Sequence, residues 1–209
     1  MSRMNTLRGL YAITDTTLSA KRGLVADVAA AIRGGAVMIQ YRDKSTDAVR
    51  REQEARALLA LCREQRVPLI INDDVELARA IGADGVHLGA EDAGMRAARN
   101  RLGDDAIIGM SCYDSLELAR SAQSAGADYL AFGAFFGSPT KPAALQAPLA
   151  LLRIAGDNLR LPLVAIGGIT PDNGAALIEA GASLLAVVSG VFAGDDPEQA
   201  AGRYAALFE

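Results

Sequence analysis

Eight short apolar runs recur along the chain, and their regular spacing leaves few folds open to it. They begin 17 to 34 residues apart, and each has the length of a single strand. Because most are continuous runs of Val, Ile, Leu and Ala, the strands are expected to be buried on both faces, as in a parallel sheet covered by helices. The runs are residues 10–14, 36–40, 68–71, 85–88, 106–110, 128–132, 162–166 and 184–188.

Segments with helical periodicity lie between the runs, because their apolar residues recur three and four positions apart. They include residues 47–66, 75–81, 116–125 and 173–180. Four joints read Gly-Ala, at 35–36, 82–83, 126–127 and 181–182, and a glycine there can take the left-handed conformation that ends a helix. Eight such units predict an α/β fold, a closed (β/α)8 or TIM barrel, as a single domain over residues 1–209 with its active site at the carboxyl ends of the strands. The alternative is a doubly wound open sheet, but no Gly-rich dinucleotide fingerprint follows the first run.

The composition limits what the chain can bind and where it works. Its net charge is −4, so the overall charge attracts neither nucleic acid nor an anionic membrane. Cys62 and Cys112 show no zinc-binding spacing, which is typical of free thiols in the cytoplasm. Residues 1–8 hold no apolar run like that of a signal peptide, and no stretch is as long and apolar as a membrane span. We therefore predict a cytoplasmic protein with small-molecule substrates, compatible with a homo-oligomer.

Polar residues directly follow the second, third and fourth runs, at the points where the carboxyl ends of barrel strands converge. Residues 40–44 read Gln-Tyr-Arg-Asp-Lys, Asn72 and Asp73 follow the third run, and Asp92 follows the fourth. Two carboxylates beside an arginine and a lysine suit a hard cation bound to a polyphosphate, because Mg²⁺ takes one or two carboxylates together with phosphate oxygens. Asp73 and Asp92 are the expected magnesium ligands.

Each of these polar residues also has a structural alternative. The helix expected at residues 75–81 needs an N-cap, and Asn72 or Asp73 could supply it. For Asp74 and Glu76 we favour a structural role, as negative charges at the positive end of that helix. The two cations after the second run could be solvated surface charges, with Asp43 as an ion-pair partner of either.

The last two runs predict a phosphate site. Gly167 and Gly168 follow the seventh run, and Ser189 and Gly190 follow the eighth. Glycines let the backbone approach a ligand closely, and a short helix near residues 191–192 would aim its amide hydrogens at an anion. Alternatively, the glycines only turn a corner and Ser189 caps a helix. Facing the predicted diphosphate site, a second anionic site implies group transfer from a diphosphate to a phosphorylated acceptor.

The fifth and sixth runs lead into further polar groups. Ser111 puts a hydroxyl on the same rim, and residues 133–142 hold a third cation, Lys141. The glycines and two phenylalanines of that loop could form a lid that brings Lys141 onto a ligand, or the loop could be a surface turn stiffened by its prolines. His87 is the only histidine and lies within the fourth run, where a hydrogen-bonded core residue is a more frequent outcome than a catalyst. No catalytic triad or activated cysteine is visible, so covalent catalysis is not indicated.

The chain resembles the thiamine-phosphate synthase family over nearly its whole length. Each matching stretch is weak evidence alone, but their order and spacing together are highly specific. They are residues 11–15 (YAITD), 40–44 (QYRDK), 72–74 (NDD), 85–89 (GVHLG) with Asp92, Ser111, 138–141 (SPTK), 166–169 (IGGI) and 188–189 (VS).

The resemblance implies a transferase of thiamine biosynthesis that uses Mg²⁺, held by Asp73 and Asp92, and releases pyrophosphate. In the implied dissociative mechanism, pyrophosphate leaves, the pyrimidine methylene carries a transient positive charge, and the thiazole nitrogen captures it. The implied catalytic residues are Arg42, Lys44, Ser111 and Lys141. The implied ligands of the pyrimidine diphosphate are Gln40, Tyr41, Arg42, Asp43, Lys44, Asn72, Ser111 and Lys141. The implied ligands of the thiazole phosphate are Ser138, Pro139, Thr140, Gly168, Val188 and Ser189.

Two alternatives share the barrel and the phosphate site. A thiazole tautomerase would only move a proton and would not need the diphosphate site, so the retained Asp73, Asp92, Lys44 and Lys141 argue against it. A non-catalytic barrel that binds a phosphate ligand is the second alternative.

Overall fold

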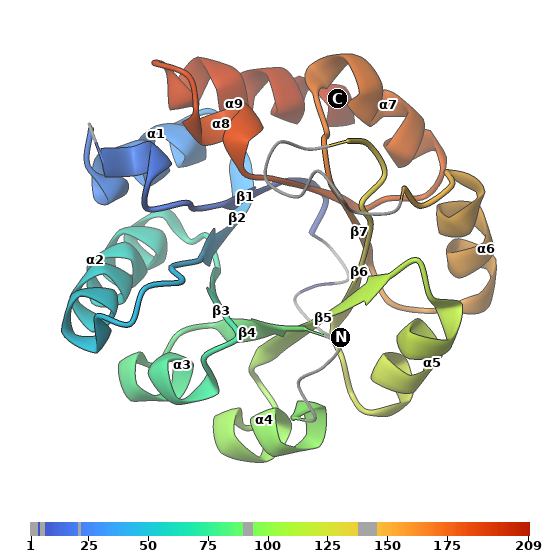
Figure 1. Ribbon diagram of the computed structural model, residues 1–209, viewed down its shortest axis with the longest axis horizontal. Helices are drawn as coiled ribbons and strands as arrows, with labels where there is room; N and C mark the ends of the chain where they lie inside the picture. The colour runs from blue at the N-terminus through green and yellow to red at the C-terminus, as the bar shows by residue number, and fades with distance from the viewer. Residues whose placement is uncertain (1–3, 5–6, 21, 90–93, 138–145) are drawn as a thin grey trace.

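The computed structural model describes residues 4, 7–20, 22–89, 94–137 and 146–209. Eight parallel strands form one closed barrel in which each strand pairs with its neighbours in sequence and β8 pairs with β1 (Figure 1). The predicted (β/α)8 barrel is therefore confirmed. The strands are β1 (Gly9–Ile13), β2 (Ala36–Tyr41), β3 (Leu69–Asn72), β4 (Gly85–Leu88), β5 (Ile107–Tyr113), β6 (Tyr129–Phe132), β7 (Leu163–Ile166) and β8 (Leu184–Val187).

Helices surround the barrel and cover the outer face of the strands (Figure 1). Among the described residues, no helix is both long enough and apolar enough to cross a membrane. The α-helices are α1 (Leu24–Arg33), α2 (Ala48–Gln65), α3 (Val75–Ile81), α4 (Met95–Leu102), α5 (Leu116–Ser124), α6 (Ala150–Asn158), α7 (Pro171–Glu179), α8 (Ser189–Phe192) and α9 (Pro197–Ala205). Two short 3₁₀ helices are η2 (Leu18–Ala20) and η3 (Ala206–Phe208).

Local sequence signals account for most of the strand and helix bounds. Seven of the eight strands lie within one residue of the prediction, and the glycines of all four Gly-Ala joints have positive φ, between 69° and 113°. The larger difference is at β5, which continues to Tyr113 instead of ending at Met110. A bulge between Ser111 and Tyr113 keeps this segment paired with β6, although its polar residues do not resemble a buried strand.

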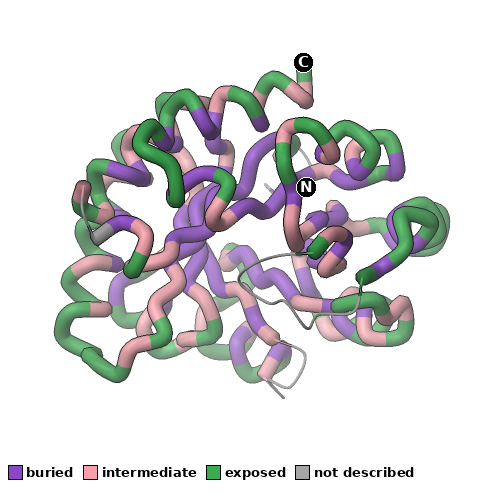
Figure 2. Tube along the Cα trace, turned by 45° about the horizontal axis from the view of Figure 1, so that its top comes forward, coloured by how far each residue is buried: buried purple, intermediate pink, exposed green. Residues whose placement is uncertain are grey.

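Buried side chains form two layers, one inside the barrel and one between the strands and the helices. Along β2, Met38 belongs to the inner layer and its neighbour Ile39 to the outer layer, as the alternation of side chains along a strand requires. Figure 2 shows the same division, with buried residues along the barrel and exposed residues on the outer faces of the helices. Apolar packing on both faces of the strands explains why their sequences are continuously hydrophobic.

Both cysteines are free and fully buried, Cys62 in α2 and Cys112 in β5. Burial raises the pKa of each thiol to about 12, so the reactive thiolate is scarce near neutral pH. We expect the native protein to react negligibly with Ellman's reagent within an hour, and both thiols to react once guanidinium unfolds the chain. Rapid reaction of either thiol in the native protein would contradict this expectation.

Candidate active site

A cavity of about 680 Å³ opens at the carboxyl ends of the strands. Every strand contributes to its lining, from Tyr11 and Ile13 of β1 to Ala186 and Val187 of β8. Seven of the predicted site residues line this one space, and they include residues assigned to each of the two predicted subsites. These residues are Gln40, Arg42, Asn72, Ser111, Gly168, Val188 and Ser189.

A second hollow of about 640 Å³ adjoins the cavity, and Asn72 lines both. Lys44 and Asp73 lie in this second hollow, next to acidic residues of the β3–α3 loop. A lysine, an amide and carboxylates therefore gather beside the main cavity, on the side of β2 and β3. The lysine provides a positive charge for an anion, and the carboxylate and amide oxygens provide ligands for a cation bound to that anion.

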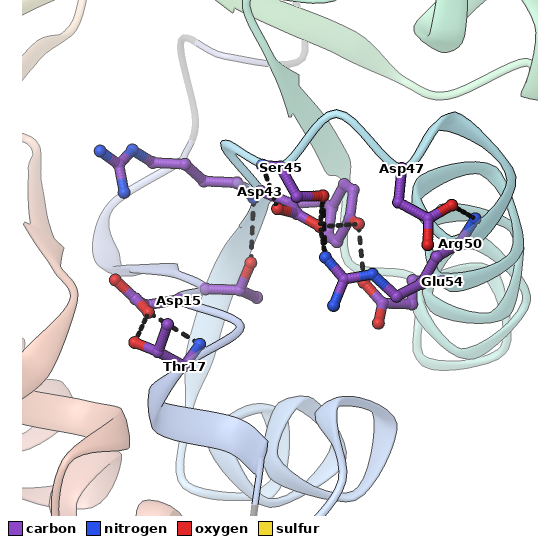
Figure 3. Close-up of polar contacts among 10 residues, drawn as sticks. Asp15, Thr17, Asp43, Ser45, Asp47, Arg50 and Glu54 are labelled. Atoms are coloured by element: carbon purple, nitrogen blue, oxygen red, sulfur yellow. Dashed lines mark hydrogen bonds and ion pairs between the residues drawn. The ribbon is translucent and has the colours of Figure 1, made fainter.

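Asp43 holds the loop after β2 in place (Figure 3). Its carboxylate accepts hydrogen bonds from the backbone N–H of Ser45 at 2.7 Å and from Arg50 at 2.7 Å. Burial alone would raise the pKa of Asp43, but the hydrogen bonds from Ser45 and the nearby arginines outweigh it and lower the pKa. The alternative in which Asp43 pairs with Arg42 or Lys44 is wrong, because the first turn of α2 brings Arg50 to it.

Tyr41 and Thr14 support the same loop from either side. The Tyr41 side chain packs in the outer core layer, and its hydroxyl donates to Glu54 of α2 at 2.7 Å. Thr14, fully buried after β1, accepts a hydrogen bond from the backbone N–H of Arg42 at 2.9 Å. Arg42 lines the cavity, and its backbone is held in place by the contacts to Thr14 after β1 and to α2.

The three polar residues at the end of β3 have two roles. Asp74 caps a helix, whereas Asn72 and Asp73 lie at the site. Asp74 is the N-cap of α3: its carboxylate accepts from the backbone N–H of Leu77 at 2.9 Å and pairs with Arg51 at 2.8 Å. The alternative in which Asn72 or Asp73 caps this helix is therefore wrong. Asn72 instead donates to the Asp73 carboxylate at 2.6 Å.

Asp73 has an unusual backbone conformation. Its φ of 61° lies in the left-handed region, which is uncommon for a residue other than glycine, and its backbone N–H donates to the carbonyl of His87 at 2.8 Å. Strained backbone of this kind is frequent at functional sites. The hydrogen bond to β4 holds Asp73 at the rim of the barrel instead of letting it enter α3.

The glycines after β7 and the short helix α8 line another part of the cavity. Gly168 has a φ of 60°, and a Cβ added there would lie 2.3 Å from the carbonyl oxygen of Gly137, so only glycine fits. Helix α8 begins at Ser189, two residues earlier than expected, and the first N–H groups of a helix have no acceptor within it. Closely approaching backbone and free N–H groups suit the binding of a phosphate.

Tyr204 of α9 contacts both the loop after β7 and helix α8. Its hydroxyl donates to the carbonyl of Ile169 at 3.0 Å, on the loop after β7. A Cβ added to Gly190 in α8 would lie 2.1 Å from the same hydroxyl oxygen. The tyrosine therefore packs against both segments, a role that its position in an amphipathic helix did not reveal.

The two phenylalanines after β6 lie in the described part of the loop that could form a lid. Phe135 is buried, and its backbone N–H donates to the carbonyl of Ile166 at 3.1 Å, while Phe136 donates likewise to Gly167 at 3.0 Å. Both phenylalanines pack in the outer core layer, so the alternative in which they cover a ligand is wrong. The predicted residues Asp92, Ser138, Pro139, Thr140 and Lys141 lie outside the described residues.

A chain of hydrogen bonds crosses the floor of the cavity. It runs from Gln40 to Tyr11 at 2.7 Å, to Tyr129 at 2.9 Å, to His87 at 2.9 Å and to Ser111 at 2.9 Å. Burial lowers the pKa of His87 to about 4, so the ring is neutral near neutral pH. The expectation of a hydrogen-bonded His87 is confirmed, whereas nothing in the sequence singled out Tyr129 except that it is polar within an apolar run.

A cavity that holds polar groups at the carboxyl ends of eight parallel strands is the position of the active site in TIM-barrel enzymes, and this is the class that the fold and cavity define. Residues 10–191 match the family described as thiamine monophosphate synthase. The chain belongs to this family and is a transferase.

Curated relatives and a solved structure agree with this assignment. The chain is 56% identical to thiamine-phosphate synthase of Thioalkalivibrio sulfidiphilus over 97% of this chain and 96% of the relative. It is 54% identical to thiamine-phosphate synthase of Nitrosococcus oceani over 96% and 92%. The structure of thiamine phosphate pyrophosphorylase from Pyrococcus furiosus superposes with a TM-score of 0.85 at 35% identity, covering 95% of this chain and 94% of that one.

Proposed function

We propose that the chain transfers the pyrimidinylmethyl group of an aminopyrimidine diphosphate to the nitrogen of a thiazole phosphate, which yields thiamine phosphate and pyrophosphate. The bond between the methylene carbon and the diphosphate oxygen breaks, and the oxygen keeps the electron pair. The methylene carbon then forms its new bond with the lone pair of the thiazole nitrogen. The names of the relatives support this reaction, and the shape of the cavity suits its two anionic substrates.

The main requirement of this reaction is that the protein stabilises the leaving diphosphate. Arg42 in the cavity and Lys44 in the adjoining hollow would neutralise the charge that develops on the leaving oxygen. Lys141, which lies outside the described residues, is proposed to join them. Holding the acceptor nitrogen close to the methylene would contribute the rest, by removing the entropic cost of bringing two substrates together.

The residues beside Lys44 fit a magnesium ion. Carboxylate and amide oxygens are hard donors, and Asp73 and Asn72 adjoin each other there. Among the described residues, no group of three or more His, Cys, Asp or Glu side chains is arranged around a common metal position. Mg²⁺ needs only one or two carboxylates when phosphate oxygens and water complete its shell, so we propose Asp73 and Asp92 as its ligands. When bound, it would neutralise part of the diphosphate charge.

The thiazole phosphate is proposed to bind between Gly168, Val188 and Ser189, where glycine backbone and the start of α8 face the cavity. The single observation that carries the proposal is that Arg42, which follows β2, and Ser189, which follows β8, line the same cavity. This arrangement would bring a diphosphate and a phosphate ester into one space, with their reacting ends between them.

The test is incubation of the purified protein with both substrates and Mg²⁺, with pyrophosphate and thiamine phosphate measured separately. Equal amounts of both products, formed only when both substrates are present, would support the proposal. Isomerisation of a thiazole phosphate without pyrophosphate release would favour the tautomerase. Tight binding of thiazole phosphate without turnover would favour a ligand-binding barrel. Reactions with EDTA in excess over Mg²⁺ test the metal dependence.

Replacing Ser189 with alanine should raise KM for the thiazole phosphate about tenfold, with a smaller change in kcat, because a hydrogen bond to the charged phosphate is lost. Steady-state kinetics with varied thiazole phosphate checks this. Ser183→Ala is a matched control, since Ser183 directly precedes β8 at the opposite end of the barrel, where its backbone pairs with Gly9 and Leu163. Equal effects of the two substitutions on KM would contradict the phosphate site.

A further inference from the structure

We infer that Tyr129 and His87 are positioning residues, which direct the hydroxyl hydrogen of Ser111 into the cavity. The observation behind this is the chain of hydrogen bonds from the buried Gln40 through the buried Tyr11 and Tyr129 to the partly buried His87 and Ser111. Its members come from five different strands, so only the closed barrel brings them together.

The direction of the chain follows from its first member. The side-chain nitrogen of Gln40 donates to the hydroxyl oxygen of Tyr11 at 2.7 Å, and an amide nitrogen can only donate. Tyr11 therefore gives its single hydroxyl hydrogen to Tyr129, whose oxygen is 2.9 Å away. Since Tyr129 accepts this bond, its own hydrogen goes to Nδ1 of His87, also at 2.9 Å.

The order of donors determines the tautomer of the histidine. Because Nδ1 of His87 accepts from Tyr129, the proton of the neutral ring is on Nε2. That N–H donates to the hydroxyl oxygen of Ser111 at 2.9 Å. Ser111 is then an acceptor toward His87, and its hydroxyl hydrogen is available to a ligand in the cavity that it lines.

Packing restricts these hydrogen-bonded side chains to few other positions. Tyr11 and Tyr129 are at most 1% exposed, so bulk water does not compete for their hydroxyls. The rings of His87 and Tyr129 stack with their centroids 5.6 Å apart, and Tyr11 meets Tyr129 edge-on at 6.0 Å. Gly109 makes room for this stack, because a Cβ there would lie 1.9 Å from the Tyr129 ring.

The consequence for substrate binding is a defined polarity at Ser111. A ligand must offer a hydrogen-bond acceptor at this point, such as a ring nitrogen or a diphosphate oxygen, and a ligand with only a donor there is disfavoured. This consequence rests on the proposed function. The tautomer of His87 does not, and it can be measured without any substrate.

His87 is the only histidine of the chain, so ¹⁵N-labelled histidine gives a single pair of ring signals once any affinity tag is removed. Two-dimensional NMR that correlates ring nitrogens with ring protons should show the pattern of the Nε2–H tautomer near neutral pH. The pattern of the Nδ1–H tautomer, of an equal mixture or of a charged ring would overturn the inference. Wild-type protein suffices for this measurement.

Two tyrosine variants test whether the hydrogen bond from Tyr129 determines the tautomer of His87. Tyr129→Phe removes the hydrogen that Nδ1 accepts, so the ring should become a mixture of tautomers. Tyr11→Phe is the matched control: it deletes one hydroxyl of the same chain but leaves the hydroxyl of Tyr129 to donate to His87, so the Nε2–H pattern should persist. An unchanged pattern in Tyr129→Phe, or the same mixture in both variants, would overturn the role of Tyr129.

Steady-state kinetics then distinguishes a positioning role of Tyr129 toward Ser111 from a general loss of core packing. Tyr129→Phe should lower kcat/KM by about three- to tenfold when Ser111 is present and hardly at all in the Ser111→Ala background, because both changes remove the same hydrogen bond. Equal factors in the two backgrounds would indicate a merely structural effect and overturn the inference. If the protein lacks synthase activity, the proposed function fails while the NMR result still decides the tautomer.

Discussion

Replacing Arg42 with alanine is expected to lower kcat about 100- to 1,000-fold, the loss typical of removing one group that stabilises a developing anion. Arg42 lines the cavity, and its backbone is held by the buried Thr14, so its position is well determined. Because the charge on the leaving diphosphate grows toward the transition state, the change should fall on kcat more than on KM for the thiazole phosphate.

The control for Arg42 is an arginine at the other end of the barrel. Arg33, at the end of α1, forms an ion pair with Glu198, and both side chains are exposed. Arg33→Ala should leave kcat unchanged and alter stability little, as is usual for exposed ion pairs. Arg42→Lys, which keeps the charge but loses the planar fork, should retain part of the activity. A kcat for Arg42→Ala within threefold of wild type would remove Arg42 from the proposed chemistry.

Replacing Gly109 with alanine is expected to lower the free energy of unfolding by about 3 kcal/mol, through overpacking of the barrel interior. The added Cβ would lie 1.9 Å from Cζ and 2.3 Å from the hydroxyl oxygen of Tyr129. That ring is fully buried, and its hydroxyl is bonded on both sides, so it cannot move away without breaking the chain to His87. Urea unfolding followed by circular dichroism measures the change.

A second glycine provides a control of opposite sign. Gly156 lies in α6, is exposed, and has no atom within 4 Å of an added Cβ. Gly156→Ala should therefore raise the free energy of unfolding by about 0.5 to 1 kcal/mol, because alanine is the better helix former. Equal stability of Gly109→Ala and wild type would mean that the interior can relax around Tyr129, contrary to the packing described.

The order of the barrel and the positions of its rim residues could be predicted from the sequence because both depend on local signals. Continuous apolar runs indicate strands buried on both faces, and positive-φ glycines such as Gly82 mark where helices end. Since parallel strands all end on the same side, a polar residue directly after a run lies on that side. This reasoning placed Arg42, Asn72 and Ser111 at one cavity.

Only the tertiary structure decided which partner each polar side chain takes. Asp43 bonds to Arg50, Asp74 pairs with Arg51 of α2, and Phe135 packs into the outer core layer instead of over a ligand. Tyr11 and Tyr129 are 118 residues apart, and closure of the barrel makes their hydroxyls neighbours. Periodicity tells which face of a strand a side chain occupies, because that is a property of the local backbone. A hydrogen-bond partner depends on distances across the interior, which exist only after the eight strands have closed.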